Sequence, residues 1–283
     1  MCDISIVMSF YNRTEQTLLT LDGFQKMYYG KYNFEVIIVD DGSNKENDLE
    51  QIIHNYSFPI KLIEIRNEDK TWINPVIPYN LGFQYCRGDN IILQNPEIFH
   101  TSDICKYIMD NLQDDLYVTF PVFAMADFEH NKRLREIFEN NVETDLEYVK
   151  FISGINYDYV PWKGWYNHKA FNCRNFHFLS ILKRNLLEKI GGFCNLFKDG
   201  LWFDDDDFLQ RIKKVARVIT EDIPHLGIHQ FHLQGSTSHS SEESRNLIEK
   251  NKTIYEGNMR DNVVYCNPDV SDLVKSYTIL TNF

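Results

Sequence analysis

Residues 34–43 are Phe-Glu-Val-Ile-Ile-Val-Asp-Asp-Gly-Ser, an apolar run that ends in two carboxylates, a glycine and a serine. The β-branched and aromatic residues of this run are typical of a buried strand. Gly42 permits a tight turn, and Ser43 can cap a following helix. Two adjacent carboxylates at the end of an apolar strand are costly unless a ligand or hydrogen bonds meet them. The stretch therefore predicts a strand that ends either in a capped turn or at a binding site.

Strand-like and helix-like segments alternate on both sides of this stretch. Strands are predicted at Ile4–Phe10, Phe34–Asp40, Ile60–Arg66, Asn90–Gln94 and Leu116–Pro121, and helices at Thr14–Tyr28, Glu46–Asn55, Pro75–Cys86 and Asp103–Asn111. This alternation indicates βαβ units and a parallel sheet. Because such sheets bind ligands beyond the carboxyl ends of their strands, functional residues are expected at the strand–helix junctions.

The alternation stops at about residue 122. The segments predicted after it are a charged helix at His130–Glu147, an aromatic loop at residues 157–166, a strand at Phe176–Ile181, a helix at Lys183–Ile190 that Gly191-Gly192 ends, and a helix from Asp204 to about Ala216. The tail after Ser240 is polar and compatible with a helix. We expect one compact domain with halves at residues 1–122 and 123–239, followed by a helical tail at 240–283.

Composition limits the partners and the location of the chain. The formal net charge is −12, from 41 acidic and 29 basic residues, and no run of Lys or Arg is present, so no nucleic acid partner is expected. Six cysteines without a Cys-x-x-Cys pair predict neither a zinc site nor a disulfide framework, and favour a reducing, cytoplasmic location. Neither a signal peptide nor a transmembrane segment is expected, whereas peripheral membrane association stays open.

The junction after the first predicted strand, Ser9–Arg13, carries small and polar groups that suit the base and ribose of a nucleotide, although Arg13 can equally begin the next helix. Together with Val39–Ser43, the segment Ile6–Arg13 resembles the opening of the family-2 glycosyltransferases. The resemblance implies a GT-A type α/β fold, which is a Rossmann-like, mostly parallel central sheet flanked by helices, with an acceptor-side subregion. It also implies a nucleotide-sugar site in the first half of the chain.

The resemblance assigns donor-binding roles to four residues of these junctions besides Arg13. It implies that Asp41 contacts the uracil ring, with Asp40 close by, that Tyr11 stacks near the base, and that Ser9 lines the same pocket. A carboxylate at this place can accept hydrogen bonds from the uracil N–H and from ribose hydroxyls. It favours a nearby phosphate only if a cation lies between them.

A second match begins at Pro78-Tyr79-Asn80-Leu81-Gly82, which resembles a helical stretch of the family with a tyrosine in place of the usual arginine. It implies that Asn80 lies on the donor side. Asn95-Pro96-Glu97 falls where the family has Asp-x-Asp, whose second acid binds Mn²⁺ or Mg²⁺. Glu97 supplies the carboxylate that such hard cations prefer. Asn95 is neutral and carries only an amide oxygen, which can accept a hydrogen bond from a ribose hydroxyl or a water. Metal binding is therefore expected to be weaker than with two aspartates.

The most specific match is Gly191-Gly192-Phe193, followed after a short loop by Asp204–Asp207 and, four residues later, by an arginine. Aspartates at a helix start suit the helix dipole, but four mutually repelling carboxylates indicate that at least one faces a ligand. In the family the second acid of a pair is the catalytic base. This implies Asp205 as the group that takes a proton from the acceptor hydroxyl, with Asp204 and Asp206 as alternatives.

Three histidines fall within the eight residues His225–His232. Metal-dependent relatives often carry a histidine here, which implies His229 as a metal ligand beside Glu97 and leaves His232 as the rival. Sugar rings stack on aromatic side chains, so the aromatic loop suggests an acceptor site at Trp162, Trp165 and Tyr166. The alternative is that these three aromatic residues belong to the core.

The resemblance covers residues 4–235 and implies an inverting, metal-dependent glycosyltransferase. The expected donor is a nucleotide diphosphate sugar, above all a UDP-sugar, and the acceptor is a hydroxyl of a glycan or another molecule. One alternative is a sugar nucleotidyltransferase, which usually carries a glycine-rich, basic phosphate loop that Ser9–Thr14 lacks. The other is a non-catalytic relative that binds a nucleotide or a glycan, which the neutral Asn95 keeps open.

Overall fold

The structure, a computed structural model, describes residues 2–140, 145–155, 164–233 and 240–282 of the 283-residue chain. The strands are β1 (Ile4–Phe10), β2 (Phe34–Asp40), β3 (Ile60–Ile65), β4 (Asn90–Gln94), β5 (Ile98–His100), β6 (Leu116–Thr119), β7 (Val122–Ala124), β8 (Trp165–Tyr166), β9 (Leu179–Lys183), β10 (Arg217–Thr220), β11 (Gly227–His229) and β12 (Tyr277–Thr281). The α-helices are α1 (Thr14–Met27), α2 (Val76–Phe83), α3 (Ile104–Asn111), α4 (Phe128–Glu139), α5 (Asp145–Ser153), α6 (Arg184–Ile190), α7 (Asp204–Ile212) and α8 (Ser241–Arg260). Short 3-10 turns lie at η1 (Lys45–Asn47), η2 (Ile53–Asn55), η3 (Asn67–Asp69) and η4 (Asn195–Asp199).

The central sheet has the strand order β10-β6-β9-β4-β1-β2-β3-β12. Strands β4, β1, β2 and β3 run parallel, and β10 is parallel to β6. Strand β9 is antiparallel to both β4 and β6, and β12 is antiparallel to β3. The predicted mostly parallel α/β sheet is therefore confirmed, and the parallel block places the ends of β1, β2 and β4 at one edge.

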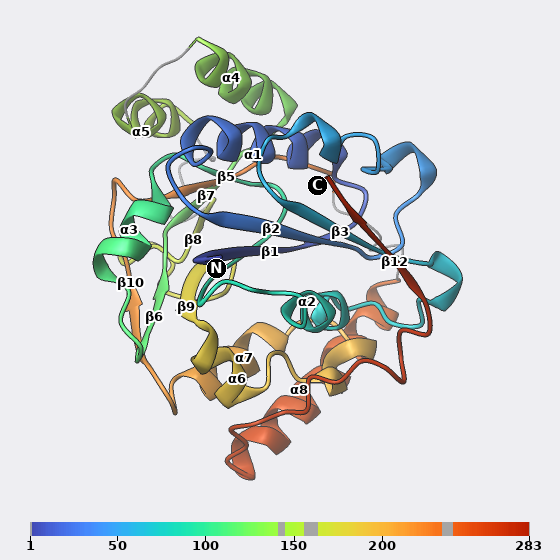
Figure 1. Cartoon of the computed structure of the whole chain (residues 1–283). Helices are drawn as coiled ribbons and strands as arrows, with labels where there is room; N and C mark the ends of the chain where they lie inside the picture. The colour runs from blue at the N-terminus through green and yellow to red at the C-terminus, as the bar shows by residue number, and fades with distance from the viewer. Residues whose placement is uncertain (1, 141–144, 156–163, 234–239, 283) are drawn as a thin grey trace.

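Both faces of the central sheet are buried because the side chains of its strands alternate between two core clusters. In β1, Ile6 and Met8 join the cluster that contains Phe24 of α1, whereas Val7 joins the cluster that contains Ile77 of α2. Figure 1 shows α1 over one face, with α4 and α5 beyond it, and α2, α6, α7 and α8 over the other face. The result is a sheet between two helical layers.

A second, smaller sheet has the order β5-β11-β7-β8. Strand β11 is antiparallel to β5 and parallel to β7, so residues from three distant parts of the chain meet here. A third core cluster joins this sheet to α4 and α5 through Phe99, Phe123, Leu134 and Tyr148. This sheet begins directly after Glu97 and therefore continues from the end of β4 into the second half of the chain.

The helix predicted at Glu46–Asn55 is wrong, because this segment holds only the two turns η1 and η2. Local polar side chains bind the backbone here instead of leaving it to a helix, as when the Glu50 N–H donates to Asp48 Oδ1 at 2.7 Å. Leu49 and Ile53 are fully buried, so their spacing of four residues reflects burial alone.

Several other predicted boundaries differ from the structure, and three in the second half of the chain differ by several residues. The charged segment His130–Glu147 is not one helix, since α4 ends at Glu139 and α5 begins at Asp145. The strand predicted from Phe176 begins at Leu179, because the Phe176 backbone bonds the Asn167 side chain at 2.8 and 2.9 Å. The helix predicted to about Ala216 ends at Ile212, whose carbonyl accepts the Ala216 N–H at 2.9 Å.

The tail beyond residue 240 contains more than the predicted helix. Ser240 and Glu243 form a capping box that begins α8, and the chain then returns to add β12 to the edge of the central sheet beside β3. No helix within the described residues is long and apolar enough to cross a membrane.

Candidate active site

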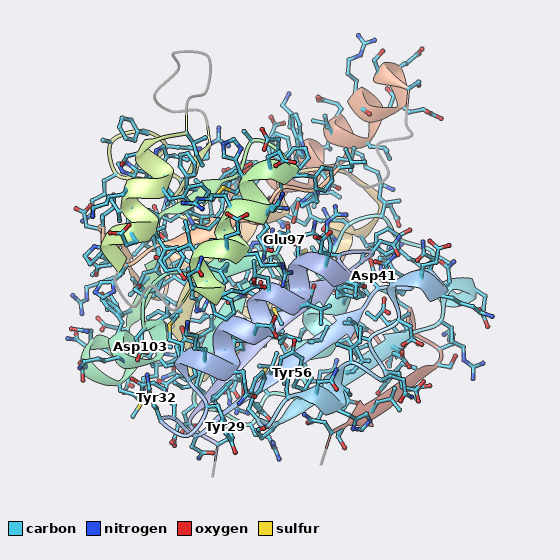
Figure 2. All side chains as sticks on the ribbon, turned by 90° about the horizontal axis from the view of Figure 1, so that it is seen from above. Tyr29, Tyr32, Asp41, Tyr56, Glu97 and Asp103 are labelled. Carbon is cyan, nitrogen blue, oxygen red and sulfur yellow. The ribbon has the colours of Figure 1, made fainter. Side chains whose placement is uncertain are left out.

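Residues predicted to bind the donor gather at the carboxyl edge of the parallel strands. Phe10 pairs with Asp40 in the register of β1 and β2, so the junctions Tyr11–Arg13 and Asp41–Ser43 begin side by side. Figure 2 shows Asp41 and Glu97 toward the end of α1 where the helix begins, with Tyr29, Tyr32 and Asp103 at its other end. The order of the strands therefore brings these separate sequence segments to one place.

Glu97 lies between two histidines. Its Oε1 is 3.1 Å from Nε2 of His229 and 3.5 Å from Nε2 of His232, and the ligand atoms of all three residues lie within 4.8 Å of one another. The sheet fixes this geometry, because Ile98 pairs with His229 and the Gln230 N–H donates to the Glu97 carbonyl at 3.1 Å. The predicted ligands Glu97 and His229 are thus adjacent, and His232 joins them.

The electrostatics of the Glu97 cluster suit a cation. Burial alone would raise the pKa of the Glu97 carboxyl, but hydrogen bonds from His229 and His232 hold it well below its usual range. One carboxylate and two neutral imidazoles are ligands of a divalent metal ion, and the imidazoles favour Mn²⁺ over Mg²⁺. The residues at this place therefore fit the predicted cofactor.

Asn95 contributes to this cluster only indirectly. Its Oδ1 accepts a hydrogen bond from the Tyr79 hydroxyl at 3.2 Å, and its amide lies 3.5 Å from Glu97 Oε1. The Tyr79 ring also packs edge-on against His177, with 5.1 Å between ring centroids. Tyr79 therefore connects the Glu97 cluster with the second acidic cluster of the site.

The second acidic cluster is Asp204–Asp207, at the start of α7, where each of three aspartates has a different partner. Asp205 pairs with Nδ1 of the buried His177. Asp204 accepts a hydrogen bond from the Asn74 amide at 2.9 Å. Asp207 forms the expected pair with Arg211 at 2.7 Å, and both side chains of that pair are buried. Only Asp205 combines a partner that orients it with an appreciably exposed side chain, at 22%.

Protonation separates the members of this cluster. Burial and the charge of Asp205 raise the pKa of Asp204 to about 7, although the Asn74 hydrogen bond opposes the shift. Burial would lower the pKa of His177, but the charge and hydrogen bond of Asp205 raise it. Burial also raises the pKa of the half-exposed Asp206. The imidazolium form of His177 is therefore held against Asp205, while Asp204 retains a proton more readily than an ordinary carboxyl.

A strained turn presents the second acidic cluster. Trp202 and Phe203 have φ angles of +62° and +63°, which are unfavourable for residues other than glycine and cost roughly 1–3 kcal/mol each. The fully buried Asn251 of α8 donates to the Trp202 carbonyl at 2.9 Å and helps to hold this turn. Trp202 itself is 68% exposed, two residues before Asp204.

Asp40 and Asp41, predicted to lie at the nucleotide base, are both buried. Asp41 accepts hydrogen bonds from Lys70 Nζ at 2.7 Å and from Trp72 Nε1 at 2.8 Å. Burial raises the pKa of Asp41 to about 6 against the opposing effect of Lys70. Asp40 accepts from the Ser43 N–H at 2.8 Å, which is the capped turn considered from the sequence. The ammonium group of Lys70 lies 4.1 Å from the centroid of the Tyr11 ring.

Asn80 is fully buried and contacts the Gly-Gly-Phe turn rather than the strand edge. Its amide donates to the Phe193 carbonyl at 2.8 Å, and its Oδ1 accepts the Phe193 N–H at the same distance. Gly192 has a φ of +65°, and a Cβ there would lie 2.4 Å from Asn80 Oδ1, so a glycine is required. In the described contacts Asn80 therefore supports the turn that precedes α7.

The three predicted acceptor residues have different surroundings. Trp165 packs against Phe123, with 4.9 Å between ring centroids, in the third core cluster. Tyr166 lies 6.0 Å from the ring of His229. Trp162 falls outside the described residues. A cavity of about 290 Å³ borders this region, and its lining residues are Tyr166, Asn167, Phe171, Asn172, Arg174, Phe176 and Phe178.

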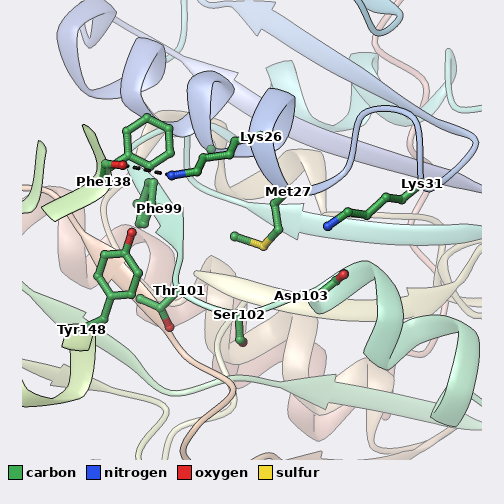
Figure 3. A pocket seen from close by; sticks show the side chains of 10 residues that line it. Lys26, Met27, Lys31, Phe99, Thr101, Ser102, Asp103, Phe138 and Tyr148 are labelled. Atoms are coloured by element: carbon green, nitrogen blue, oxygen red, sulfur yellow. Dashed lines mark hydrogen bonds between the residues drawn. The ribbon is translucent and has the colours of Figure 1, made fainter. Parts of the chain in front are cut away.

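A cavity of about 450 Å³ lies at the far end of α1, away from both acidic clusters. Figure 3 shows Lys26 beside Phe99 and Phe138, and Lys31 on the other side of the cavity, across from Asp103. Lys26 already donates to the Phe138 carbonyl at 3.0 Å. Because neither the Glu97 nor the Asp204–Asp207 cluster lines this cavity, we do not assign the chemistry to it.

Several residues of the site carry no recognisable sequence signal. These residues lie in loops without periodic patterns. His177 contacts Asp205, Asn74 contacts Asp204, and Asp41 is contacted by Lys70 and Trp72. Only the aromatic and polar composition of residues 70–75 marks that loop as unusual. Arg13 lies near Glu97, whose charge opposes the lowering of the Arg13 pKa by burial. Ser9 lies at the end of β1, where it is half-buried.

Comparison with known proteins is consistent with this arrangement. TarS 1-349 of S. aureus has a TM-score of 0.52 at 14% identity, and the match covers 81% of this chain and 60% of that one. The same protein in complex with UDP-GlcNAc has a TM-score of 0.53 at 14% identity, covering 87% of this chain and 64% of that one. This chain therefore spans less than two thirds of these structures, and at this identity the likeness shows the GT-A type fold alone.

Sequence comparison identifies the family. A search among curated proteins found no match. The profile described as glycosyl transferase family 2 matches residues 5–186, which is more than half of the chain. The match includes the donor-side junctions and Glu97, and it ends before the Asp204–Asp207 cluster. The chain belongs to glycosyl transferase family 2.

Proposed function

We propose that this protein transfers a sugar from a nucleotide diphosphate sugar to a hydroxyl of a glycan or another acceptor, with inversion at the anomeric carbon. The observation that carries the proposal is the connection of two unlike clusters through Tyr79. One is the carboxylate and two imidazoles at Glu97, and the other is the oriented carboxylate of Asp205. A transferase needs both a place for a diphosphate with its cation and a base for the acceptor.

Glu97, His229 and His232 are the residues that would hold Mn²⁺ or Mg²⁺, with Mn²⁺ favoured by the imidazoles. A bound divalent cation supplies positive charge that stabilises the diphosphate as it leaves. The chain itself keeps Glu97 ionised through its two histidine partners. It also anchors the backbone at this place, since the Gln230 side chain donates to the Glu97 carbonyl at 3.1 Å.

Asp205 is the proposed base. Its pairing with the buried His177 fixes one carboxylate oxygen, which leaves the other available to accept the proton of the acceptor hydroxyl. The acceptor oxygen then attacks the anomeric carbon from the face opposite to the leaving diphosphate, which inverts the configuration. Asp204 and Asp206 remain the alternatives, but Asp204 is more buried and holds a proton more readily.

The proposed donor nucleotide is UDP. Support comes from the resemblance of the Asp41 junction to uracil-binding relatives, and from the shared fold of a protein solved with UDP-GlcNAc. Ser9 lies at the end of β1, Tyr11 lies on the adjacent junction, and Arg13 directly precedes α1. Because Lys70 and Trp72 donate hydrogen bonds to Asp41, these two side chains would orient the Asp41 carboxylate toward the uracil ring.

The proposed acceptor site is the cavity beside Tyr166. Aromatic side chains and amides line it, as is common where sugar rings bind, and Tyr166 reaches toward His229. Trp165 and Trp162 complete the acceptor set expected from the sequence, although Trp165 lies in the core cluster of the small sheet.

Calorimetric titration of UDP in Mn²⁺ and in EDTA tests the donor and metal assignments. GDP and CMP serve as control nucleotides. Glu97→Ala is the test variant, and Glu188→Ala, which replaces an exposed carboxylate of α6, is the matched control. We expect UDP binding that requires both the metal and Glu97 and that is unchanged in Glu188→Ala. Binding indifferent to metal would remove the proposed role of Glu97.

The neutral Asn95 favours one rival, a relative that binds a nucleotide but does not catalyse transfer. The carbonyl oxygen of Asn95 is already engaged by Tyr79, so it adds little to a metal shell. Hydrolysis or transfer of a UDP-sugar separates the two functions. Tight UDP binding without turnover on any hydroxyl acceptor would favour the rival.

A further inference from the structure

Two cysteines that are far apart in the sequence meet beneath α7. The Sγ atoms of Cys194 and Cys266 and a carboxylate oxygen of Asp207 all lie within 4.8 Å of one another. Both thiols are free, and both residues are buried, at 4% and 8% exposure. Neither cysteine takes part in the proposed reaction, and both lie beyond the stretch that matches the family profile.

The backbone fixes the two cysteines against each other. Cys266 donates its N–H to the Ile190 carbonyl at 3.0 Å, so the segment after α8 is tied to the end of α6. Gly191 has a φ of +70°, and a Cβ there would lie 1.8 Å from the Cys266 carbonyl oxygen. Only glycine permits this crossing. The approach of Cys266 to the turn that carries Cys194 is therefore built into the fold.

The surroundings of the thiols disfavour a metal ion. Both carboxylate oxygens of Asp207 are already used, one by Arg211 Nε at 2.7 Å and the other by the Asn258 amide at 2.7 Å. A cation would therefore find two sulfur ligands and a buried guanidinium beside it. Structural metal sites of proteins usually provide four ligands and no neighbouring positive charge. The chemistry left to the pair is that of two adjacent thiols.

We propose that Cys194 and Cys266 form a reversible intramolecular disulfide when the protein meets a peroxide. The Cys194 thiolate attacks one oxygen of the peroxide O–O bond, which yields a sulfenic acid and, with the thiol proton, one water from hydrogen peroxide. The Cys266 sulfur then attacks the Cys194 sulfur and a second water leaves. Two thiols are oxidised by two electrons in total, and the O–O bond accepts them.

The order of attack follows from the hydrogen bond between the thiols. That bond, from Cys266, lowers the pKa of Cys194 to about 7 against the effect of burial. The same bond and burial raise the pKa of Cys266. Cys194 is therefore the thiol that ionises more readily and is expected to react first.

The bond would close a loop that contains α7 and both histidines of the Glu97 cluster. Cross-linking a loop of this length constrains the unfolded chain, so the oxidised protein should melt about 5–10 °C higher than the reduced protein. A reductant should return the melting temperature to its starting value, because the pair is a thiol–disulfide couple.

Mass spectrometry after peroxide treatment tests the proposal on the full chain. The exposed Cys173 is replaced in a Cys173→Ser background, which removes links between molecules. We expect a linked peptide pair that contains Cys194 and Cys266, and a rise in melting temperature that a reductant reverses. Both effects should vanish in Cys194→Ser and in Cys266→Ser, and both should persist in Cys86→Ser, a buried cysteine at another place.

Two results would overturn the disulfide. The first is that both thiols remain open to alkylation after unfolding, under peroxide conditions that fully oxidise Cys173 in the wild-type chain. The second is one bound metal ion per reduced chain that is lost in Cys194→Ser. The peptide analysis of the wild-type sequence decides the matter even if a serine variant folds poorly, because it needs no substitution.

Discussion

The two acidic clusters at the open edge of the sheet are built in opposite ways. Glu97 sits between two imidazoles that donate to it, and its pKa is lowered despite burial. Asp204 and Asp205 sit beside each other, and burial with mutual repulsion raises the pKa of Asp204 to about 7. One cluster therefore favours an ionised Glu97 carboxylate, whereas in the other the Asp204 carboxyl retains its proton more readily.

This difference teaches which neighbours decide the role of a buried acid. Burial acts in the same direction on both clusters, so it does not distinguish them. The donors do: Glu97 has His229 and His232, whereas the Asp204 carboxyl has one neutral amide and a charged neighbour. A metal site and a proton-accepting site can thus be separated by their hydrogen-bond partners alone.

The largest expected effect is that of Asp205→Asn. If Asp205 accepts the acceptor proton, its amide should lower kcat by about 10³-fold or more, since a positioned base contributes 10²–10⁴-fold. UDP binding should be unchanged, because the substitution leaves the Glu97 cluster intact. The measurement is steady-state release of UDP with a saturating acceptor.

Asp206→Asn is the matched control for that experiment, since Asp206 is the adjacent, half-exposed carboxyl. We expect a change in kcat of less than about 10-fold in this variant, because it leaves the proposed base in place. Wild-type turnover in Asp205→Asn would move the base to another aspartate, and a collapse in Asp206→Asn would identify that aspartate.

The next effect concerns the metal cluster. Loss of a group that only orients a ligand typically costs 10–100-fold in metal affinity, so removal of a ligand should cost at least about 100-fold. We expect His229→Ala and His232→Ala each to weaken Mn²⁺ binding by that amount in titrations followed by electron paramagnetic resonance. His225→Ala is the control, since His225 lies beside Ser102, away from Glu97. Unchanged affinity in either test variant would remove that histidine from the metal shell.

A third effect sharpens the contrast in pKa. The pKa of Asp204 is raised from 3.8 to about 7, so the folded protein binds a proton more tightly than the unfolded chain between these values. The contribution of Asp204 to stability is therefore greatest at low pH and is lost as the pH rises toward 7. Asp204→Asn should therefore reduce the change in the free energy of unfolding between pH 4.5 and 7 by roughly 2 kcal/mol.

Urea unfolding at a series of pH values measures that change in slope. Asp206→Asn provides the comparison, because burial also raises the pKa of Asp206 but its side chain is half-exposed. We expect the pH dependence of stability to change less in Asp206→Asn than in Asp204→Asn. Parallel stability curves for the wild type and Asp204→Asn would show that Asp204 titrates as an ordinary carboxyl.

The sequence predicts one part of this arrangement much better than the other. The strands and helices of the parallel block follow from apolar periodicity, and the end of a predicted strand locates Asp41, whereas Glu97 is assigned by the resemblance to the family. The segment Glu46–Asn55 misleads because its buried leucine and isoleucine have helical spacing while its polar side chains bind the local backbone. Periodicity reports burial, and it does not distinguish a helix from a tight succession of turns.

The partners of the acids are the part that the sequence does not reveal. His177 precedes β9 and Asn74 precedes α2, yet both contact the start of α7. Such contacts arise only when the sheet places distant loops at one edge, so no pattern within a short stretch of sequence predicts them. The resemblance and the spacing of the histidines predict His229 as a ligand with His232 as the rival, and the structure places both imidazoles beside Glu97.

The smallest expected effect separates two neighbouring aromatic residues of β8. Tyr166 lines the cavity beside His229, whereas Trp165 packs in the core cluster of the small sheet. If the acceptor binds in that cavity, Tyr166→Ala should raise the acceptor KM by about 5- to 10-fold, the loss expected for one stacked ring, with the donor KM unchanged. Trp165→Ala should instead lower the melting temperature and change both KM values little. The reverse pattern, with the acceptor KM sensitive to Trp165 and indifferent to Tyr166, would place the acceptor on the other face of the strand.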